Sequence, residues 1–230
     1  MKRDCRARKF FVEWMRIVSD CVARIFRAIV IFVEGRKRNM ELLKQRIRQD
    51  GTVRGTDVLK VDSFLNHQMD IELFSQMGQE FFRLFGDCGV NKILTIEASG
   101  IGMACVTAQY FHCPVVFAKK SMSSNISDHV YSAPVKSFTH GNQYNAIVSK
   151  EYLHPEDRIL VIDDFLAMGE ALRGLFSLVQ QSGATLIGAG IAVEKAFQPG
   201  GDQLRSEGYR IESLARVAAM SEEGGVVFAR

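Results

Sequence analysis

The chain has 230 residues, of which 47% are hydrophobic, and this is enough for one domain with a sizeable core. Its five cysteines are odd in number and lack CxxC spacing, which argues against a disulfide framework or a structural zinc site and favours the cytoplasm. The net charge of +3 conceals a mildly acidic body, because residues 1–39 contain eleven Lys or Arg and only four Asp or Glu. An acidic body argues against nucleic-acid binding.

Residues 1–39 have the pattern of a basic amphipathic helix. Charged residues between Glu13 and Arg27 recur at steps of three and four, with apolar residues around them. This pattern fits a membrane-surface anchor or a partner helix, but the uncharged run at 28–33 is too short to span a membrane. Residues 34–39 can be encoded almost wholly in purines, as a translated ribosome-binding site would be, and Met40 follows at once. We therefore expect the functional domain to be residues 40–230, with Met40 as the natural start and no membrane contact.

The body of the chain alternates between helix and strand patterns. A short helix is expected over 41–48, then a small hood over 57–67, then a helix over 69–84. From residue 92 onward, strands and helices alternate as in an α/β protein with a mainly parallel, twisted sheet flanked by helices. The expected ranges are strands at 92–96, 115–118, 158–162 and 185–193, and helices at 100–111 and 170–181. The polar stretch 119–141 is long for a loop in a compact domain and is typical of a lid or of a disordered segment.

The segment at 159–172, ILVIDDFLAMGEAL, carries the strongest functional signal. Its first four residues are apolar without alternation, as in a strand covered on both faces, so Asp163 and Asp164 should emerge at the carboxyl end. The turn that follows opens a helix, whose unpaired N–H groups and dipole suit a phosphate monoester. Two carboxylates beside a phosphate would repel it, unless they face hydroxyl groups of the same ligand. The segment therefore points to a ribose 5-phosphate, with simple helix capping as the alternative.

Several motifs together resemble a known family. VIDDFLAMGEA is similar to the phosphoribosyl-diphosphate (PRPP) signature of the type I phosphoribosyltransferases. LTIEASGIG at 94–102 resembles the loop that takes the diphosphate, and VVFAKK at 115–120 resembles the strand before the mobile loop. GIAVEKAFQPGG at 190–201 and YRIESLARV at 209–217 resemble the xanthine phosphoribosyltransferases in particular. The resemblance covers residues 40–230 and implies the type I phosphoribosyltransferase fold.

The resemblance also implies roles for individual residues. The PRPP-binding candidates lie in the acidic pair, the turn after it and the loop at 97–100: Asp163, Asp164, Ala167, Met168, Gly169, Glu170, Ala171, Glu97, Ala98, Ser99 and Gly100. Lys119 and Lys120 are candidates for loop residues that approach the diphosphate, and the base-binding candidates are Leu59, Asn66, Lys195 and Phe197. No catalytic nucleophile is assigned, and no side chain is assigned as a direct metal ligand.

The implied reaction is purine salvage, in which a purine nitrogen attacks the anomeric carbon of PRPP and diphosphate leaves. Such a reaction depends on holding two reactants in line and on stabilising the departing charge. Mg²⁺ is expected to arrive with PRPP, because it prefers substrate phosphates plus few carboxylates. Lys195 follows an apolar strand and is expected to donate to a carbonyl of xanthine, which selects against the amino group of adenine. The product would be xanthosine 5′-monophosphate, and the family also implies a homodimer.

Three residues depart from the family pattern. Met168 stands where Asn or Thr is usual, Glu170 replaces an uncharged or basic residue, and Lys119 stands where Arg is common. Each change removes a donor or adds a negative charge near a phosphate. They bear on the catalytic strength of the site and not on the fold.

Two other functions fit parts of the same pattern. A guanine or hypoxanthine phosphoribosyltransferase would share the PRPP motifs, and only Lys195 and the carboxyl-terminal motifs favour xanthine. A non-catalytic PRPP-sensing purine regulator would share the acidic pair, but it would carry a DNA-binding domain, for which 39 residues are too few.

Overall fold

The computed structural model describes residues 41–120, 129–136 and 143–229. The expectations for residues 1–39, and for most of the loop after Lys120, lie outside these described residues. Within them, six strands form a sheet in the order β10-β9-β8-β7-β3-β4, and all neighbours are parallel except β10 and β9. The sheet strands are β3 (Lys92–Ile96), β4 (Val115–Ala118), β7 (Arg158–Leu166), β8 (Thr185–Lys195), β9 (Ile211–Ser221) and β10 (Gly225–Phe228). The predicted mainly parallel sheet is thereby confirmed.

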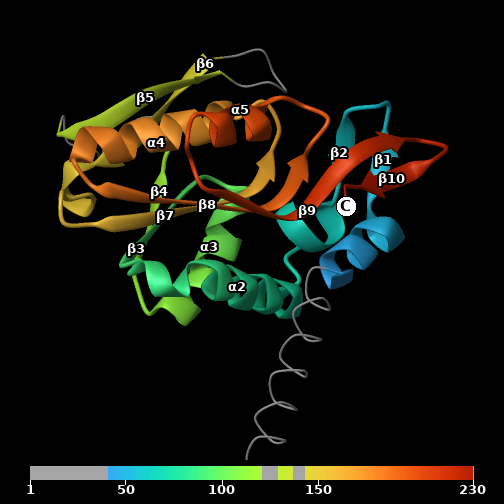
Figure 1. The fold of residues 1–230 in the computed structure, drawn as a ribbon, viewed down its shortest axis with the longest axis horizontal. Coiled ribbons are helices and arrows are strands. Elements are labelled where there is room, and N and C mark those ends of the chain that lie inside the picture. Colours follow the sequence, from blue (N-terminus) through green and yellow to red (C-terminus); the bar gives the residue numbers. More distant parts are fainter. Residues whose placement is uncertain (1–40, 121–128, 137–142, 230) are drawn as a thin grey trace, which may run out of the picture. The chain divides into compact units, whose positions relative to one another are not determined.

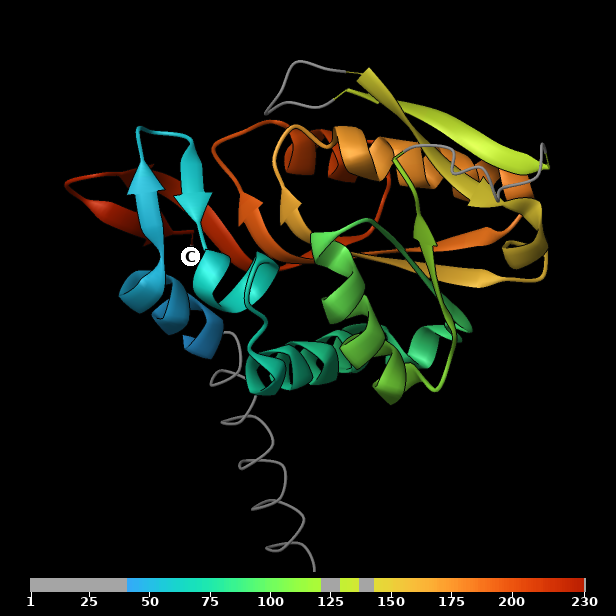
Figure 2. The same cartoon turned by 180° about the vertical axis from the view of Figure 1, so that it is seen from behind.

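Helices cover both faces of this sheet. Figure 1 shows α2 (Ile71–Phe85) and α3 (Ser99–Phe111) on one face, with α4 (Glu170–Ser182) and α5 (Gly200–Ser206) on the other. The hairpin of β5 (Val130–Lys136) and β6 (Gln143–Ser149) lies over α4. Figure 2 shows the same layers from behind. The carboxyl ends of the parallel strands therefore remain open at one edge, where ligands bind in such sheets.

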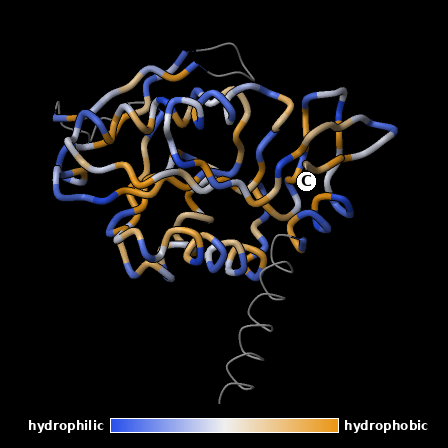
Figure 3. Tube along the Cα trace, viewed as in Figure 1, coloured by the Kyte–Doolittle hydropathy of each residue, from blue (hydrophilic) through white to orange (hydrophobic). Residues whose placement is uncertain are grey.

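The central strand β7 is buried on both faces of the sheet. Its apolar residues alternate between two separate cores: Leu160 and Ile162 pack with α2 and α3, while Ile159 and Val161 pack with α4 and the β5–β6 hairpin. Figure 3 shows hydrophobic residues concentrated along the central strands. A strand buried on both faces needs a continuous apolar run, and residues 159–162 supply it.

The predicted hood contains more regular structure than the sequence suggested. After a helix at 41–50, β1 (Thr52–Arg54) and β2 (Val58–Lys60) form a hairpin, and a π-helix, η1 (Asp62–Asn66), follows. The hairpin packs at the β9–β10 end of the sheet. Two short 3₁₀ turns, η2 (Gly86–Cys88) and η3 (Lys150–Tyr152), complete the described elements.

The structure corrects two boundaries. β7 runs to Leu166, so Asp163 and Asp164 lie inside the strand and not after it, because pairing with β8 continues past both acids. The stretch at 119–141 is not one loop, because Val130–Lys136 pairs with Gln143–Ser149 to form the β5–β6 hairpin.

No helix within 41–120, 129–136 and 143–229 is long and apolar enough to cross a bilayer.

Candidate functional site

Three neighbouring parallel strands end at one edge of the sheet and carry most of the predicted site residues. Strand β7 lies between β3 and β8. The loop at 97–98 follows β3, the turn at 167–169 follows β7, and Lys195 is the last residue of β8. The structure thus brings the proposed diphosphate loop, phosphate turn and base-binding lysine to the same edge.

The turn after β7 has the backbone of an anion-binding helix start. Gly169 precedes α4 with φ of +85°, a conformation that residues with a side chain rarely adopt. The first helical residues, Glu170 and Ala171, lie in the turn whose N–H groups have no partner inside the helix. Hydrogen bonding to Glu207 is the main cause of the raised pKa of the Arg173 guanidinium on the same helix, and the charge of Glu170 adds to it. Both terminal nitrogens of Arg173 are bound to Glu207.

The acidic pair is more buried than its predicted role at a strand end implied. Asp163 is 4% exposed and Asp164 is 9% exposed. The pKa of Asp163 is raised well above its usual value, first by burial and second by the charge of Asp164, while Lys120 acts in the opposite direction. A buried carboxylate with a raised pKa, adjacent to a second buried carboxylate, is typical of a functional site. A ligand rich in hydroxyl donors, together with a cation, would stabilise both in the charged form.

The loop after β3 is held close to this pair and to the proposed mobile loop. The peptide bond between Glu97 and Ala98 is cis. A Glu97 carboxylate oxygen accepts a hydrogen bond from the Lys120 backbone N–H at 2.6 Å. Gly100, in the first turn of α3, lies so close to Asp163 that a Cβ atom there would be 3.2 Å from a carboxylate oxygen. Glu97, Gly100, Lys120 and Asp163 therefore form one neighbourhood.

The two loop lysines differ in their surroundings. Lys119 exchanges two backbone hydrogen bonds of 2.9 Å with Ile147, which fixes the start of the loop against β6. The Lys120 ammonium lies 5.4 Å from the centre of the Tyr144 ring and is part of an exposed residue. The backbone at the start of the loop is thus fixed, and the exposed side chain of Lys120 extends from it.

Lys195 joins β8 to the hood. Its ammonium donates a hydrogen bond of 2.5 Å to the backbone carbonyl oxygen of Asp57, and it lies 5.8 Å from the centre of the Phe165 ring. Burial lowers the pKa of Lys195, and the charge of Asp57 acts in the opposite direction. A half-buried ammonium at the mouth of the hood is well placed to donate to a carbonyl group of a planar base.

The remaining base-binding candidates lie in different environments. Leu59 on β2 is 6% exposed and packs in the core beneath the hood, while Phe197 is 40% exposed and offers a ring for stacking. The side-chain oxygen of Asn66 is buried and accepts no hydrogen bond from the residues that the structure describes. An unsatisfied buried acceptor is costly, so a donor on the bound base would stabilise it.

The structure adds two residues that the sequence did not single out. The side-chain oxygen of Gln198, three residues after Lys195, and the hydroxyl of Thr95, beside Gly100, are both buried, and neither has a hydrogen-bond partner within 41–120, 129–136 or 143–229. Gln198 lies within a motif that was already noticed, but only its burial distinguishes it from a surface glutamine. We include both among the proposed site residues.

Met168 provides a first test of the phosphate turn. Met168→Asn is expected to tighten PRPP binding by about 0.5–1.5 kcal/mol, the net contribution of one added hydrogen bond. Calorimetric titration with PRPP measures this change, and Met168→Leu, which adds no donor, is the matched control. Unchanged or weaker binding in the asparagine variant would show that backbone N–H groups already saturate the phosphate.

Comparison with solved structures identifies the fold as that of phosphoribosyltransferases. Adenine phosphoribosyltransferase of Trypanosoma brucei, solved with AMP, pyrophosphate and ribose-5-phosphate, matches with a TM-score of 0.66 and 17% identity, over 80% of this chain and 83% of that one. The enzyme of Rhodothermus marinus matches with a TM-score of 0.64 and 19% identity, over 79% of this chain and 99% of that one. The fold predicted from the sequence is therefore confirmed.

Relatives found by sequence show to which family of phosphoribosyltransferases the chain is similar. Xanthine phosphoribosyltransferase of Lachnoclostridium phytofermentans is 58% identical over 191 residues, which cover 83% of this chain and 98% of the relative. That of Ruminiclostridium cellulolyticum is 58% identical over 189 residues, which cover 82% of this chain and 99% of the relative. No family model matches the chain. The chain belongs to the xanthine phosphoribosyltransferase family.

Proposed function

We propose that this chain transfers the 5-phosphoribosyl group of PRPP to xanthine, giving xanthosine 5′-monophosphate and diphosphate. The observation that carries the proposal is the position of Lys195 at the end of β8, on the same sheet edge as the Asp163–Asp164 pair and the 167–171 turn. The family of the chain supports the same enzyme class.

The donor side of the site would bind PRPP through three groups of residues. The N–H groups at Ala167–Ala171 would hold the 5-phosphate, with Met168 contributing its backbone only. Asp163 and Asp164 would accept from the ribose hydroxyls. The N–H groups at Glu97–Gly100 and the Ser99 hydroxyl would hold the diphosphate, with Lys120 adding positive charge as it leaves.

Mg²⁺ fits this donor set. Two carboxylates lie where the ribose hydroxyls would bind, and hard oxygen ligands are those that the ion prefers. With the ion bound, the charge of the departing diphosphate would be neutralised in part. Asp163 and Asp164 would orient the ribose and would act on the ion only through its outer coordination shell. No side chain is proposed as a direct ligand of the ion.

The base side would be formed by β8 and the hood. Lys195 would donate to a carbonyl oxygen of xanthine, Asn66 would accept from a ring N–H, and Phe197 would stack on the base. Leu59 would shape the pocket from the core beneath the hood. Because no covalent intermediate is needed, the side chains of this site would act by position and charge.

Product analysis tests the proposal directly. The purified chain, incubated with PRPP, Mg²⁺ and xanthine, is expected to form xanthosine 5′-monophosphate and diphosphate in equal amounts, as measured by mass spectrometry and a diphosphate assay. Omission of xanthine is the control for simple PRPP hydrolysis. Diphosphate without the nucleotide, or neither product, would reject the function.

The residue three positions after the acidic pair gives a pH-dependent prediction. Some 6-oxopurine enzymes resembling this chain carry an aspartate there as a general base, whereas this chain has Ala167. Xanthine ionises near neutral pH and needs little help, so the ratio of kcat/KM for xanthine over hypoxanthine should rise with pH as xanthine loses its proton. Ala167→Asp should favour hypoxanthine relatively more, whereas Ala167→Asn, which cannot accept a proton, should not. A ratio that is independent of pH and of both substitutions would contradict this account.

Location in the cytoplasm and assembly as a homodimer follow from the cysteine pattern and the family resemblance, respectively. Both stay predictions. Light scattering of the purified chain measures its oligomeric state.

A further inference from the structure

A short helix, α5, follows the proposed base strand β8 in the chain and packs against the proposed phosphate turn. Its first residue, Gly200, lies directly against the backbone of the turn. A Cβ atom on Gly200 would overlap the Ala167 carbonyl oxygen and the Met168 carbonyl carbon, and it would lie 2.6 Å from the Gly169 nitrogen. This contact is between backbones, which cannot yield as a flexible side chain can, so the position of α5 fixes one side of the turn.

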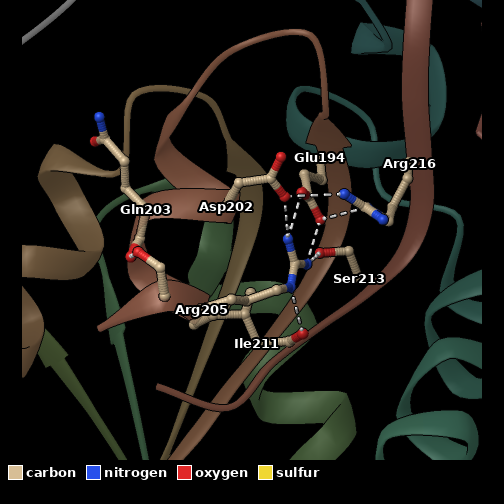
Figure 4. Close-up of polar contacts among 8 residues, drawn as sticks. Glu194, Asp202, Gln203, Arg205, Ile211, Ser213 and Arg216 are labelled. Carbon is tan, nitrogen blue, oxygen red and sulfur yellow. Dashed lines mark hydrogen bonds and ion pairs between the residues drawn. The ribbon is translucent and has the colours of Figure 1, made fainter. Parts of the chain in front are cut away.

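The same helix is held to β8 by a cluster of charged residues around the buried Glu194, shown in Figure 4. Glu194, 1% exposed and adjacent to Lys195, accepts hydrogen bonds of 2.8 and 2.6 Å from the two terminal nitrogens of Arg205. Arg216 on β9 lies 3.2 Å from the same carboxylate. Asp202, also on α5, forms ion pairs with Arg205 at 3.5 Å and Arg216 at 3.3 Å. Three segments of the chain therefore meet at one carboxylate.

The surroundings of Glu194 favour the charged form of its carboxylate. Burial alone would raise its pKa, but hydrogen bonds from Arg205 and Ser213, with the charges of Arg205 and Arg216, lower it below the usual value. Gly201 is packed so closely that a Cβ atom there would overlap a Glu194 carboxylate oxygen and lie 2.9 Å from Arg205. The cluster thus has a single tight arrangement and little room for repacking.

The far end of α5 is tied to the helix that follows the phosphate turn. Both terminal nitrogens of Arg173, on α4, donate to the Glu207 carboxylate at 2.7 Å. Glu207 is the residue at the end of α5. This pair is exposed and so contributes little by itself, but it places a second contact between α5 and the phosphate-binding segment.

We propose that Glu194 is a positioning residue for both substrates, acting through Arg205 and α5 to hold the phosphate turn in register with Lys195. The inference rests on the proposed function for the roles of the turn and of Lys195. It extends that function because Glu194 would affect PRPP binding from the base strand, without contacting PRPP. A purely structural Glu194 would alter stability and leave the affinities for both substrates unchanged.

Glu194→Gln tests the proposal, because glutamine keeps the shape and removes the charge. Glu80→Gln is a matched control: Glu80 is 3% exposed and binds Arg83 through two carboxylate oxygens, but it lies on α2, away from the turn. Calorimetry gives the Kd for PRPP without any base, steady-state assays give the KM for xanthine, and thermal unfolding gives Tm for both variants.

The expected result is a rise of about tenfold in both the PRPP Kd and the xanthine KM for Glu194→Gln, the size that loss of a charged hydrogen bond produces. Glu80→Gln should leave both values within about twofold of the original chain, whatever its Tm. If Glu194→Gln does not fold, Arg205→Lys keeps the charge and loses the two-point contact, so it should raise both constants by a smaller factor.

The proposal is overturned by a PRPP Kd that is unchanged in the variant that folds, or by an equal rise in Glu80→Gln. Failure of the proposed function would instead appear as no turnover by the unaltered chain, and the PRPP Kd would still decide the role of Glu194.

Discussion

Lys195→Ala is expected to raise the KM for xanthine by about ten- to 150-fold, corresponding to about 1.5–3 kcal/mol for a hydrogen bond to a charged group. The ammonium already donates to a hood carbonyl at 2.5 Å and is half-buried, so its loss would leave a base carbonyl without a donor. The KM for PRPP should change by no more than about twofold, since no PRPP contact is assigned to this side chain. Steady-state kinetics with each substrate varied in turn measure both values.

Lys195→Met separates the ammonium from its aliphatic stem and gives this prediction a control. If the charge is what binds xanthine, methionine should behave like alanine. The wild-type KM for xanthine should also rise on the alkaline side as Lys195 loses its proton, at a lower pH than an ordinary lysine because burial lowers its pKa. The methionine variant should lack this rise. Equal effects on xanthine and PRPP, or a methionine variant with normal KM, would refute the assigned role.

Gly100→Ala is the second change with a large expected effect, because it adds a methyl group where the diphosphate loop meets the acidic pair. The new Cβ would overlap the Thr95 hydroxyl and lie 3.2 Å from an Asp163 carboxylate oxygen. Both neighbours belong to strands of the central sheet and are almost fully buried, so the start of α3 must move instead. We expect kcat/KM for PRPP to fall by about a hundredfold, since small displacements at a reacting centre cost this much.

Gly102→Ala is the matched control on the same helix. A Cβ atom there would overlap only the Met69 sulfur and lie 2.9 Å from its terminal carbon, and the end of a 39% exposed methionine can move aside. This variant should retain kcat/KM for PRPP within about threefold. It adds the same methyl group to α3 and therefore changes the intrinsic helix propensity in the same way as Gly100→Ala. Similar losses in the two variants would show that α3 as a whole, rather than its contact with Asp163, is sensitive.

The sequence predicted the central sheet well because local pattern and tertiary environment agree there. β3 and β4 have the expected bounds, and α3 begins one residue earlier than expected. Strands covered on both faces need unbroken apolar runs, and such runs are visible in a single sequence. The position of Lys195 at the carboxyl end of its strand could be predicted in the same way, since the apolar run of β8 ends at Val193, two residues before it.

Features that depend on distant partners were not predictable from local pattern. Two acids usually interrupt a strand, yet β7 continues through Asp163 and Asp164 because β8 pairs with it up to Leu166. The β5 strand lies in a polar stretch and is defined by its pairing with β6. Likewise, the burial of Glu194 requires arginines from α5 and β9, which become its neighbours only when the chain folds.

Competition among purine bases tests the central claim most directly. The purified chain receives limiting PRPP with Mg²⁺ and equal concentrations of xanthine, guanine, hypoxanthine and adenine, and the nucleotide monophosphates are separated and quantified. Their early ratios equal the ratios of kcat/KM. We predict that xanthosine 5′-monophosphate is the main product. A main product from guanine, hypoxanthine or adenine would contradict the assignment of xanthine as the substrate, and no nucleotide from any base would contradict phosphoribosyl transfer itself.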